Sequence, residues 1–319
     1  MFLLALVFAG CGAVARADVA EPVASPYSVL RFADFASVLG RAAGWAENNV
    51  PLLDYPDLDL NTTYYYRWRL FREHLARLQG RTVITEFLPH CKAGAAPTTH
   101  CLRMTSCAEG FHIAEASWLR DAAVADDALL FWLELAGAEL YGYSEWIGWS
   151  AVRRHELVGN FTFGLRLLDG MVTAFRGNGG SYGGNAAKYL HNGTGHQQCW
   201  FQKDGNDGME FSISGDGCRP TINAIMFGEA DAIVRLAKSV GNATIAAEFE
   251  QWREMSQRAT LDLWNNAIDT FAVRSFSHDS GAPLDPPQFV QDSARCDLSV
   301  VRKLGRLVGV RELLGFVPW

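Results

Sequence analysis

The sequence predicts an all-α fold built from successive helical hairpins. Apolar residues recur at three- and four-residue steps through most of the chain, which is the spacing of amphipathic helices. Alternation of apolar and polar residues, the pattern of a strand, is confined to two short segments. The chain has 319 residues, of which 49% are hydrophobic, so it can bury a large core.

The helical pattern is clearest near the centre of the second half of the chain. Ile222, Met226, Ile233 and Leu236 recur at helical spacing, and the segment from Ile245 onward repeats the pattern. The turn-like residues between these segments predict a helical hairpin. Further helices are expected over residues 27–48, 63–78, 113–122, 126–141, 146–157, 161–175 and 298–314, and extended pieces over 81–89 and 209–214.

Two turn-rich insertions interrupt the helices, at residues 90–107 and 176–196. The first contains His90, Cys91, His100, Cys101 and Cys107, whose spacing fits no Cys-x2-Cys pair, so a disulfide-pinned loop is favoured over a zinc cluster. The second is rich in glycine and lacks the Gly-Lys-Ser/Thr ending of a phosphate loop, which favours a surface insertion. Neither insertion marks a domain boundary.

The first residues have the features of a secretory signal. Residues 1–17 contain a short apolar run followed by Ala15-Arg16-Ala17, a small-x-small cleavage pattern. An N-terminal segment is expected over residues 18–60, before the helical domain of residues 61–319. No later segment approaches the length of a membrane span. The chain is therefore expected to be secreted or to lie in the lumen of the secretory pathway.

The sequons and the cysteines also favour the secretory pathway. Four N-x-S/T sequons begin at Asn61, Asn160, Asn192 and Asn242. Removal of the signal, which contains Cys11, leaves an even number of cysteines, and an oxidising compartment would pair them. The sequence does not choose among the possible pairings.

The overall charge argues against nucleic acid as a partner. The chain has 28 basic and 35 acidic residues, and no basic run stands out. The residues imply no metal and no organic cofactor.

Two aromatic-rich helices are candidate sugar-binding surfaces. Flat amphipathic rings stack on sugar faces, and arginine and tyrosine donate hydrogen bonds to sugar hydroxyls. The alternatives are an aromatic core helix for the first and a salt-bridged helix surface for the second. The candidate residues are Tyr65, Tyr66, Arg67 and Trp68 in the first helix, and His112, Glu115, Trp118, Arg120 and Asp121 in the second.

The segment 207–223, DGMEFSISGDGCRPTIN, offers a candidate general acid. A glycoside hydrolase needs a carboxylic acid that protonates the leaving oxygen, and an apolar setting keeps such a group protonated. Glu210 lies between Met209 and Phe211, so burial of the segment would raise its pKa. Asp207 is the alternative acid, and a loop carboxylate that only caps the helix beginning near Thr221 is a further possibility. A Ser-His-Asp triad is disfavoured, because the chain has no G-x-S-x-G elbow.

Five segments in the same order resemble secreted six-hairpin glycosidases: YYYRWRLFREH, VITEFLP, GFHIAEASWLRD, DGMEFSISGDGCRPTIN and RELLGFVPW. Together they are similar to the catalytic domain of the mannosylglycerate hydrolase family, and more distantly to trehalases and processing α-glucosidases. The resemblance extends from about residue 64 to residue 319. It implies an (α/α)6 toroid with the sugar bound at the wide end, and hydrolysis with inversion by an acid and a base.

The resemblance also implies roles for individual residues. Glu210 occupies the frame of the general acid, and Arg219 and Asn223 would brace its loop. Trp118, Arg120 and Asp121 would line the subsite of the cleaved sugar. Glu86, in VITEFLP, joins the expected substrate-binding residues. Two positions depart from the usual pattern, since Ser117 replaces an arginine and Cys218 replaces a tyrosine.

In these relatives the general base and the closing helices follow the GFVPW motif. The toroid is therefore expected to be incomplete at its C-terminus, as in a fragment or truncated gene model, with the base beyond residue 319. Two rival functions stay open: a non-catalytic secreted carbohydrate-binding protein, and a polysaccharide lyase on a related α/α toroid that would use tyrosine or histidine. The sugar and its linkage are open as well.

Overall fold

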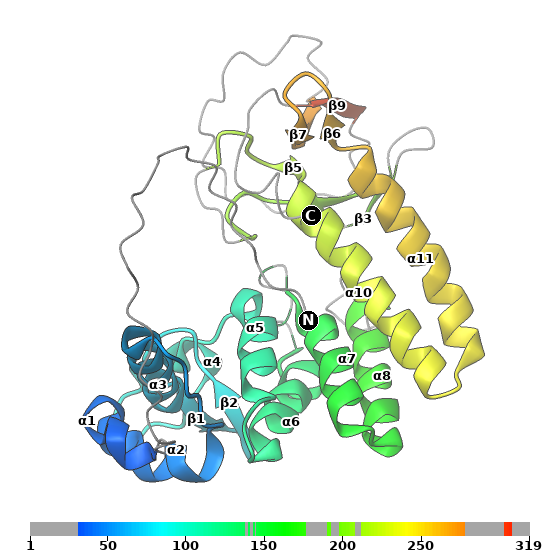
Figure 1. The fold of residues 1–319 in the computed structure, drawn as a ribbon. Coiled ribbons are helices and arrows are strands. Elements are labelled where there is room, and N and C mark those ends of the chain that lie inside the picture. Colours follow the sequence, from blue (N-terminus) through cyan, green and yellow to red (C-terminus); the bar gives the residue numbers. More distant parts are fainter. Residues whose placement is uncertain are drawn as a thin grey trace, which may run out of the picture.

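The computed structural model describes most of the chain between residues 31 and 307 (Figure 1). The described residues are 31–137, 140, 143, 145–176, 190–192, 198–207, 212–277 and 303–307. Helices make up most of this part and strands are few and short, so the predicted all-α class is confirmed. None of the helices in these ranges has the length and apolar character needed to cross a membrane.

The N-terminal helices are shorter than the sequence predicts. The helix expected over 27–48 is divided, because Gly40 has a φ of +52° that interrupts the helical backbone. Asp57 begins the next helix by accepting hydrogen bonds from the backbone N–H groups of Asp59 and Leu60. The elements are η1 Phe32–Phe35, α1 Ala36–Leu39, η2 Gly40–Ala42, α2 Ala43–Asn49 and α3 Leu58–Glu73.

A short hairpin follows α3 in place of the last helical turn predicted over 63–78. Strands β1 (Leu75–Leu78) and β2 (Arg81–Ile84) pair antiparallel, which confirms the start of the extended segment expected over 81–89. Gln79 and Gly80 connect them, with φ values of +49° and +80°. Two successive positive φ values suit the tight turn of a two-residue hairpin, and this turn chemistry overrides the helical spacing.

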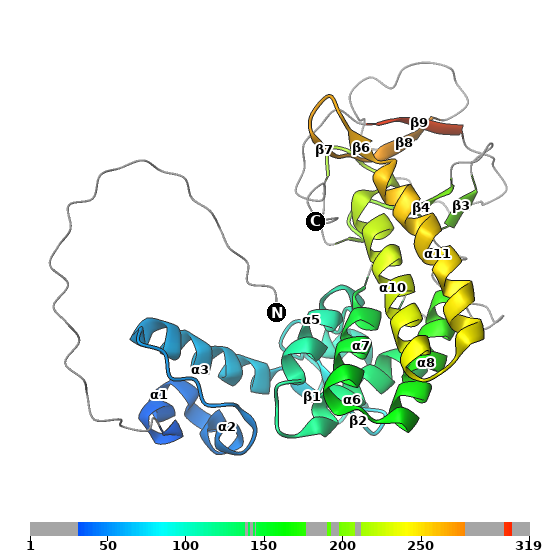
Figure 2. The same ribbon diagram turned by 45° about the vertical axis from the view of Figure 1, so that its right-hand side comes forward.

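Within the described residues, three helical hairpins form the body of the molecule (Figures 1 and 2). The short α4 (Thr99–Leu102) precedes them. The first hairpin contains α5 (Ser106–Ala116) and α6 (Ala122–Leu130), which continues as the π-helical turn η3 (Phe131–Leu135). The others are α7 (Ile147–Val158) with α8 (Phe161–Arg176), and α10 (Pro220–Ser239) with α11 (Ala243–Leu261).

The first helices of the first two hairpins run parallel. The Ser150 hydroxyl donates a hydrogen bond of 2.8 Å to the Gly110 carbonyl near the start of both helices. Beyond the other end of α5, the Arg154 guanidinium lies 3.4 Å from the Ala122 carbonyl. The N-termini of α5 and α7 therefore lie at the same end of the molecule.

Helix α10 has the same direction as α7. The Gly148 N–H at the start of α7 donates to the Glu229 carboxylate at 2.9 Å, and His155 near its end lies 3.0 Å from the Ser239 hydroxyl. Helix α10 extends nine residues N-terminal to Glu229, so its first turn lies about 14 Å beyond the start of α7. This shared end of the three parallel helices is called the N-terminal end below.

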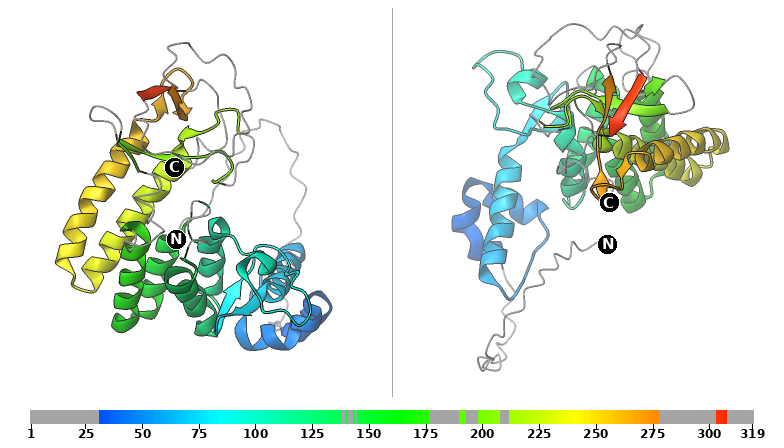
Figure 3. Two further views of the ribbon diagram at one scale, coloured as in Figure 1. Left: turned by 180° about the vertical axis from the view of Figure 1, so that it is seen from behind. Right: turned by 90° about the horizontal axis from the view of Figure 1, so that it is seen from above.

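An antiparallel sheet lies at the N-terminal end, near the start of α10 (Figure 3). The short pair β6 (Trp264–Asn265) and β7 (Thr270–Phe271) lies nearby. The five strands of the sheet, in spatial order, are β3 (Leu190–Asn192), β4 (Gln198–Gln202), β5 (Gly217–Cys218), β8 (Arg274–Ser277) and β9 (Lys303–Leu307).

Strand β9 corrects the helix predicted over 298–314. Residues 303–307 pair with β8, because its edge offers backbone groups that need partners and Gly305 weakens a helix there. The extended piece predicted over 209–214 is also not found at residues 212–214, and residues 209–211 lie outside the described ranges.

One tryptophan joins the sheet to the helices. Trp200 on β4 is fully buried, and its indole N–H donates to the Ser256 hydroxyl on α11 at 2.9 Å. Its ring contacts Phe175 on α8 and Trp252 on α11. Trp200 therefore belongs to the main helical core, whereas Cys199, Cys218 and Phe271 pack in a smaller second cluster with Ala259 and Leu263 of the α11 end.

Two disulfides lie within the described part of the chain. Cys91–Cys101 closes the loop predicted to be pinned by a disulfide, and the described residues contain no cluster of metal ligands. Cys199–Cys218 links β4 to β5. Cys107 is a free thiol, and Cys296 lies outside the described ranges.

Candidate functional site

The loop between β4 and α10 is held by one buried arginine. Arg219 directly precedes α10, and its side chain has no exposed surface. It donates to both carboxylate oxygens of Asp207, at 2.7 and 3.2 Å, and to the Gly215 carbonyl at 2.5 Å. Asp204 lies 3.4 Å from the same guanidinium. A planar, doubly hydrogen-bonded pair of this kind fixes both position and orientation.

The two flanks of residues 208–211 are both tied to this arginine. On one side, Asp207 pairs with Arg219 directly. On the other side, the Ser212 N–H donates to the Asp204 carboxylate, which is itself paired with Arg219. Glu210, the predicted general acid, lies in this interval, outside the described residues.

Asp207 is fully engaged as an acceptor. Its side chain is buried, and it accepts from the Thr221 hydroxyl at 2.5 Å in addition to Arg219. Donation of a proton from Asp207 would require this ion pair to be broken. Arg219 itself occupies the N-cap position of α10, and its side chain forms no cap.

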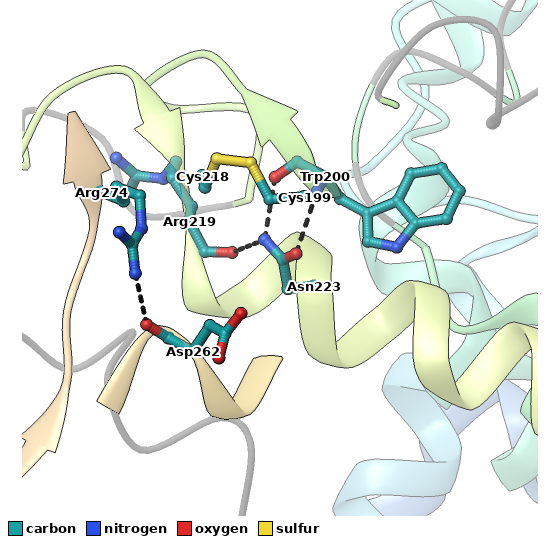
Figure 4. Close-up of a disulfide and its surroundings, with 7 residues drawn as sticks. All are labelled: Cys199, Trp200, Cys218, Arg219, Asn223, Asp262 and Arg274. Carbon is teal, nitrogen blue, oxygen red and sulfur yellow. Dashed lines mark hydrogen bonds between the residues drawn. A yellow bond between two sulfur atoms is a disulfide. The ribbon is translucent and has the colours of Figure 1, made fainter. Parts of the chain in front are cut away.

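Asn223 ties the same loop to strand β4 (Figure 4). Its side-chain oxygen accepts from the Trp200 N–H at 2.9 Å, and its amide nitrogen donates to the carbonyls of Trp200 and Arg219. The disulfide Cys199–Cys218 lies beside these bonds. Arg219 and Asn223 thus occupy internal, fully buried positions, which suit bracing of the loop rather than direct contact with a sugar.

A second cluster of charged side chains lies on helix α5 and beside it. Glu109 is completely buried, and neither carboxylate oxygen has a hydrogen-bond partner. His112 lies one turn later, with Nδ1 3.8 Å from the Glu109 carboxylate, a distance typical of an ion pair rather than a hydrogen bond. Nearby, the Thr105 hydroxyl donates to Glu86, and Arg67 on α3 pairs with Glu115 at 2.7 Å.

The charged groups of this cluster shift the pKa values of Glu109 and His112. Burial raises the pKa of Glu109, and the nearby His112 only partly opposes this effect. Burial alone would lower the pKa of His112, but the neighbouring carboxylates of Glu109, Glu115 and Glu86 outweigh it and raise the pKa. Of the predicted site residues, the structure therefore brings together Glu86, His112, Glu115 and Arg67. Sequence reasoning missed Glu109, which is the most deeply buried member of this group.

An aromatic pair of one exposed and one half-buried ring lies towards the N-terminal end. Phe111 on α5 is 58% exposed, and its ring centre lies 6.1 Å from that of Trp146, just before α7. Both were missed from the sequence. The exposure of Phe111 could have been found from the helical spacing. The buried face of α5 contains Glu109, Ile113 and Ala116, and position 111 lies outside that face.

The structure places Trp118, Arg120 and Asp121 away from the Arg219 loop. They follow the C-terminus of α5, whereas the loop precedes the N-terminus of the parallel helix α10. Arg120 binds the carbonyls of Glu47 and Asn49, and Asp121 caps α6 through the Ala123 N–H. Trp118 is 67% exposed, so its ring is open to a ligand at that other end.

The four residues from α3 divide between core and surface. Tyr65 and Trp68 are buried, with Tyr65 stacked on Phe35 and its hydroxyl bonded to the Leu53 backbone. These two positions fit the alternative of an aromatic core helix. Tyr66 and Arg67 are exposed beside α5, where a sugar could reach them.

A pair of buried glutamates at the start of α7 was also missed. Glu145 accepts from the Ile147 N–H at 2.7 Å, and Glu229 from the Gly148 N–H. Burial and the neighbouring Glu145 raise the pKa of Glu229 well above its usual range. The pair binds the N–H groups of a helix start, where negative charge is stabilised.

Comparison with known proteins matches this chain to a glycosidase family. The family model described as mannosylglycerate hydrolase MGH1-like glycoside hydrolase domain matches residues 102–319. A solved structure named "Sialidase" is similar to the fold, with a TM-score of 0.62 and 26% identity over 77% of this chain. The match spans only 24% of that protein's own length. Among curated proteins, no match is found.

Proposed function

The chain belongs to the MGH1-like glycoside hydrolase domain family, and from this premise we propose that it supplies the acid half of a site that hydrolyses O-glycosidic bonds with inversion. Glu210 is the proposed general acid. It protonates the leaving oxygen of a glycoside while a base activates water on the opposite face of the sugar. The base is proposed to follow the GFVPW motif, as the resemblance to the family implies.

The observation that carries this proposal is the anchoring of both flanks of Glu210 to Arg219. A general acid must be held within hydrogen-bond reach of the leaving oxygen, so its loop must be rigid. Asp207 and Ser212 supply fixed ends on the two sides of residue 210. The position of the loop at the start of α10 also agrees with the order of motifs in the family.

Sugar contacts are proposed at the N-terminal end of the parallel helices. Phe111 and Trp146 offer ring faces there, with Glu86 and His112 nearby as polar partners. Tyr66, Arg67 and Trp118 are proposed as more distant contacts, beyond the cleaved sugar. The complete domain is proposed to be an (α/α)6 toroid in which the three hairpins form one part.

We also propose secretion of the protein after removal of residues 1–17. Two disulfides are compatible with an oxidising compartment.

The test is made in the full-length protein and compares Glu210→Gln with Asp207→Asn. Glu210→Gln keeps the shape of the side chain but removes the proton donor, so turnover of a glycoside should fall by roughly 10²–10⁴-fold while binding of the sugar is retained. Asp207→Asn should lower both stability and activity, because it disrupts the Arg219 pair. Retained activity in Glu210→Gln would reject the assignment.

Product analysis separates the rival functions. A hydrolase releases a reducing sugar, whereas a lyase releases an unsaturated product that absorbs in the near ultraviolet. A protein that binds sugar without releasing either product would support the carbohydrate-binding alternative.

A further inference from the structure

The four sequons differ in whether the folded protein can carry a sugar on them. Attachment of a glycan requires an asparagine side-chain nitrogen that can reach solvent in the final fold. Three of the asparagines have described side chains: Asn61, Asn160 and Asn242. The side chain of Asn192 lies outside the described part of the structure.

Asn61 is closed to modification in the folded state. It is only 4% exposed, and both the oxygen and the nitrogen of its side-chain amide form hydrogen bonds. Its oxygen accepts from the Tyr55 N–H at 3.0 Å, and its nitrogen donates to the Tyr55 carbonyl at 2.8 Å. A glycan on this nitrogen would break the second bond and would have to pass through packed protein, so a glycosylated Asn61 could not adopt this fold.

In Asn160 and Asn242, unlike Asn61, only the side-chain oxygen forms a hydrogen bond with described residues. Each lies at a helix start and accepts a backbone N–H through its oxygen, Asn160 from Phe163 at 3.0 Å and Asn242 from Ile245 at 3.1 Å. Within the described structure, neither amide nitrogen donates a hydrogen bond. A sugar on that nitrogen therefore leaves the helix cap intact.

The surroundings of these two sequons are also open. Asn160 is exposed and Asn242 is half-buried, and the hydroxyl-bearing residues Thr162 and Thr244 that complete the motifs are both exposed. Four apolar side chains near Asn160 are exposed together, a feature that a covering group would explain. They are Leu157, Val158, Phe161 and Leu165.

The two sequons share one end of the molecule. They lie in the turns between α7 and α8 and between α10 and α11, and the Ser239 hydroxyl at the end of α10 lies 3.0 Å from His155 near the end of α7. Helix α10, with 20 residues, separates this end from the Arg219 loop by about 30 Å (Figure 1). Glycans there would not obstruct the proposed site.

We propose that Asn160 and Asn242 are N-glycosylation sites and that Asn61, despite its sequon, is not. The amide nitrogen bonds to the anomeric carbon of an oligosaccharide carried on a polyisoprenyl diphosphate. The bond from that carbon to the diphosphate oxygen breaks, the lipid diphosphate leaves with the electron pair, and the nitrogen loses one proton.

The test removes each sequon while leaving its asparagine and the cap in place. Thr63→Val, Thr162→Val and Thr244→Val are expressed separately in the full chain, in a host that glycosylates, behind a leader known to direct secretion. Secreted protein is compared before and after treatment with a peptide N-glycosidase, and the converted sites are mapped by peptide mass spectrometry.

Thr162→Val and Thr244→Val should each lose one glycan relative to the parent, whereas Thr63→Val should lose none. Loss of a glycan in Thr63→Val, or an unmodified Asn160 in secreted parent protein, would overturn the proposal. The same chain with its own first 17 residues tests secretion separately. If only the leader-replaced form is secreted and carries the glycans, the secretion proposal fails and the glycan assignment holds.

Discussion

Replacement of Arg219 by methionine should destabilise the protein strongly. Methionine has similar length but no charge, so Asp207 would be left buried and without its cation. Removal of one member of a buried ion pair typically costs about 3–5 kcal/mol, because the remaining charge is desolvated and unpaired. The Gly215 carbonyl would also lose a donor. We therefore expect a loss near the upper part of that range.

A double-mutant cycle isolates the pair. In Arg219→Met with Asp207→Asn, the fully buried charge of Asp207 is removed together with its cation, and only the partly exposed Asp204 loses a partner. The loss should therefore be smaller than the sum of the two single changes by about 1–3 kcal/mol. Arg235→Met is the matched control, because Arg235 pairs with Glu156 on the surface and such pairs contribute at most about 1 kcal/mol.

Urea unfolding followed by tryptophan fluorescence measures these free energies. The reasoning would be refuted if Arg219→Met cost no more than Arg235→Met. It would also be refuted if the two changes in the Arg219–Asp207 cycle were simply additive.

Two further predictions concern the start of α7. Burial and Glu145 raise the folded-state pKa of Glu229, so its contribution to stability is complete below the unfolded pKa and is lost as pH rises through the folded pKa. The urea midpoint should therefore be higher at pH 5 than at pH 8, and Glu229→Gln should reduce the difference between the two midpoints. An unchanged difference in that variant would contradict the assignment of the pH dependence to Glu229. Gly148→Ala should destabilise by about 1–3 kcal/mol, because its added methyl group overlaps the Glu229 carboxylate. Gly228→Ala, where nothing lies within 4 Å, should not destabilise, and equal losses in both would contradict the packing argument.

The helical body was predictable from the sequence, because its signal is local. Helices α7, α8, α10 and α11 bury one face against neighbours, and apolar spacing reports this directly. The strands were not predictable in the same way. Strand β5 has two residues and β9 pairs with β8 across a long stretch of chain, so their existence depends on partners that no local pattern encodes.

The candidate site was predicted in part, for a similar reason. Arg219 and Asn223 could be assigned to the loop because they lie close to it in sequence. Glu109 could not, since a glutamate next to a glycine in a helix gives no sign that its carboxylate is completely buried. The resemblance to the family implied that Trp118 lines the subsite of the cleaved sugar, and the parallel direction of α5 and α10 places it away from the acid loop.

The stereochemistry of the first product tests the central claim most directly. NMR of the reaction of the full-length protein, recorded before the released sugar equilibrates, should show the anomer opposite to that of the substrate, and Glu210→Gln should abolish its appearance. Release of the same anomer as the substrate, or an unchanged rate in Glu210→Gln, would contradict the proposal that this chain contributes the general acid of an inverting glycosidase.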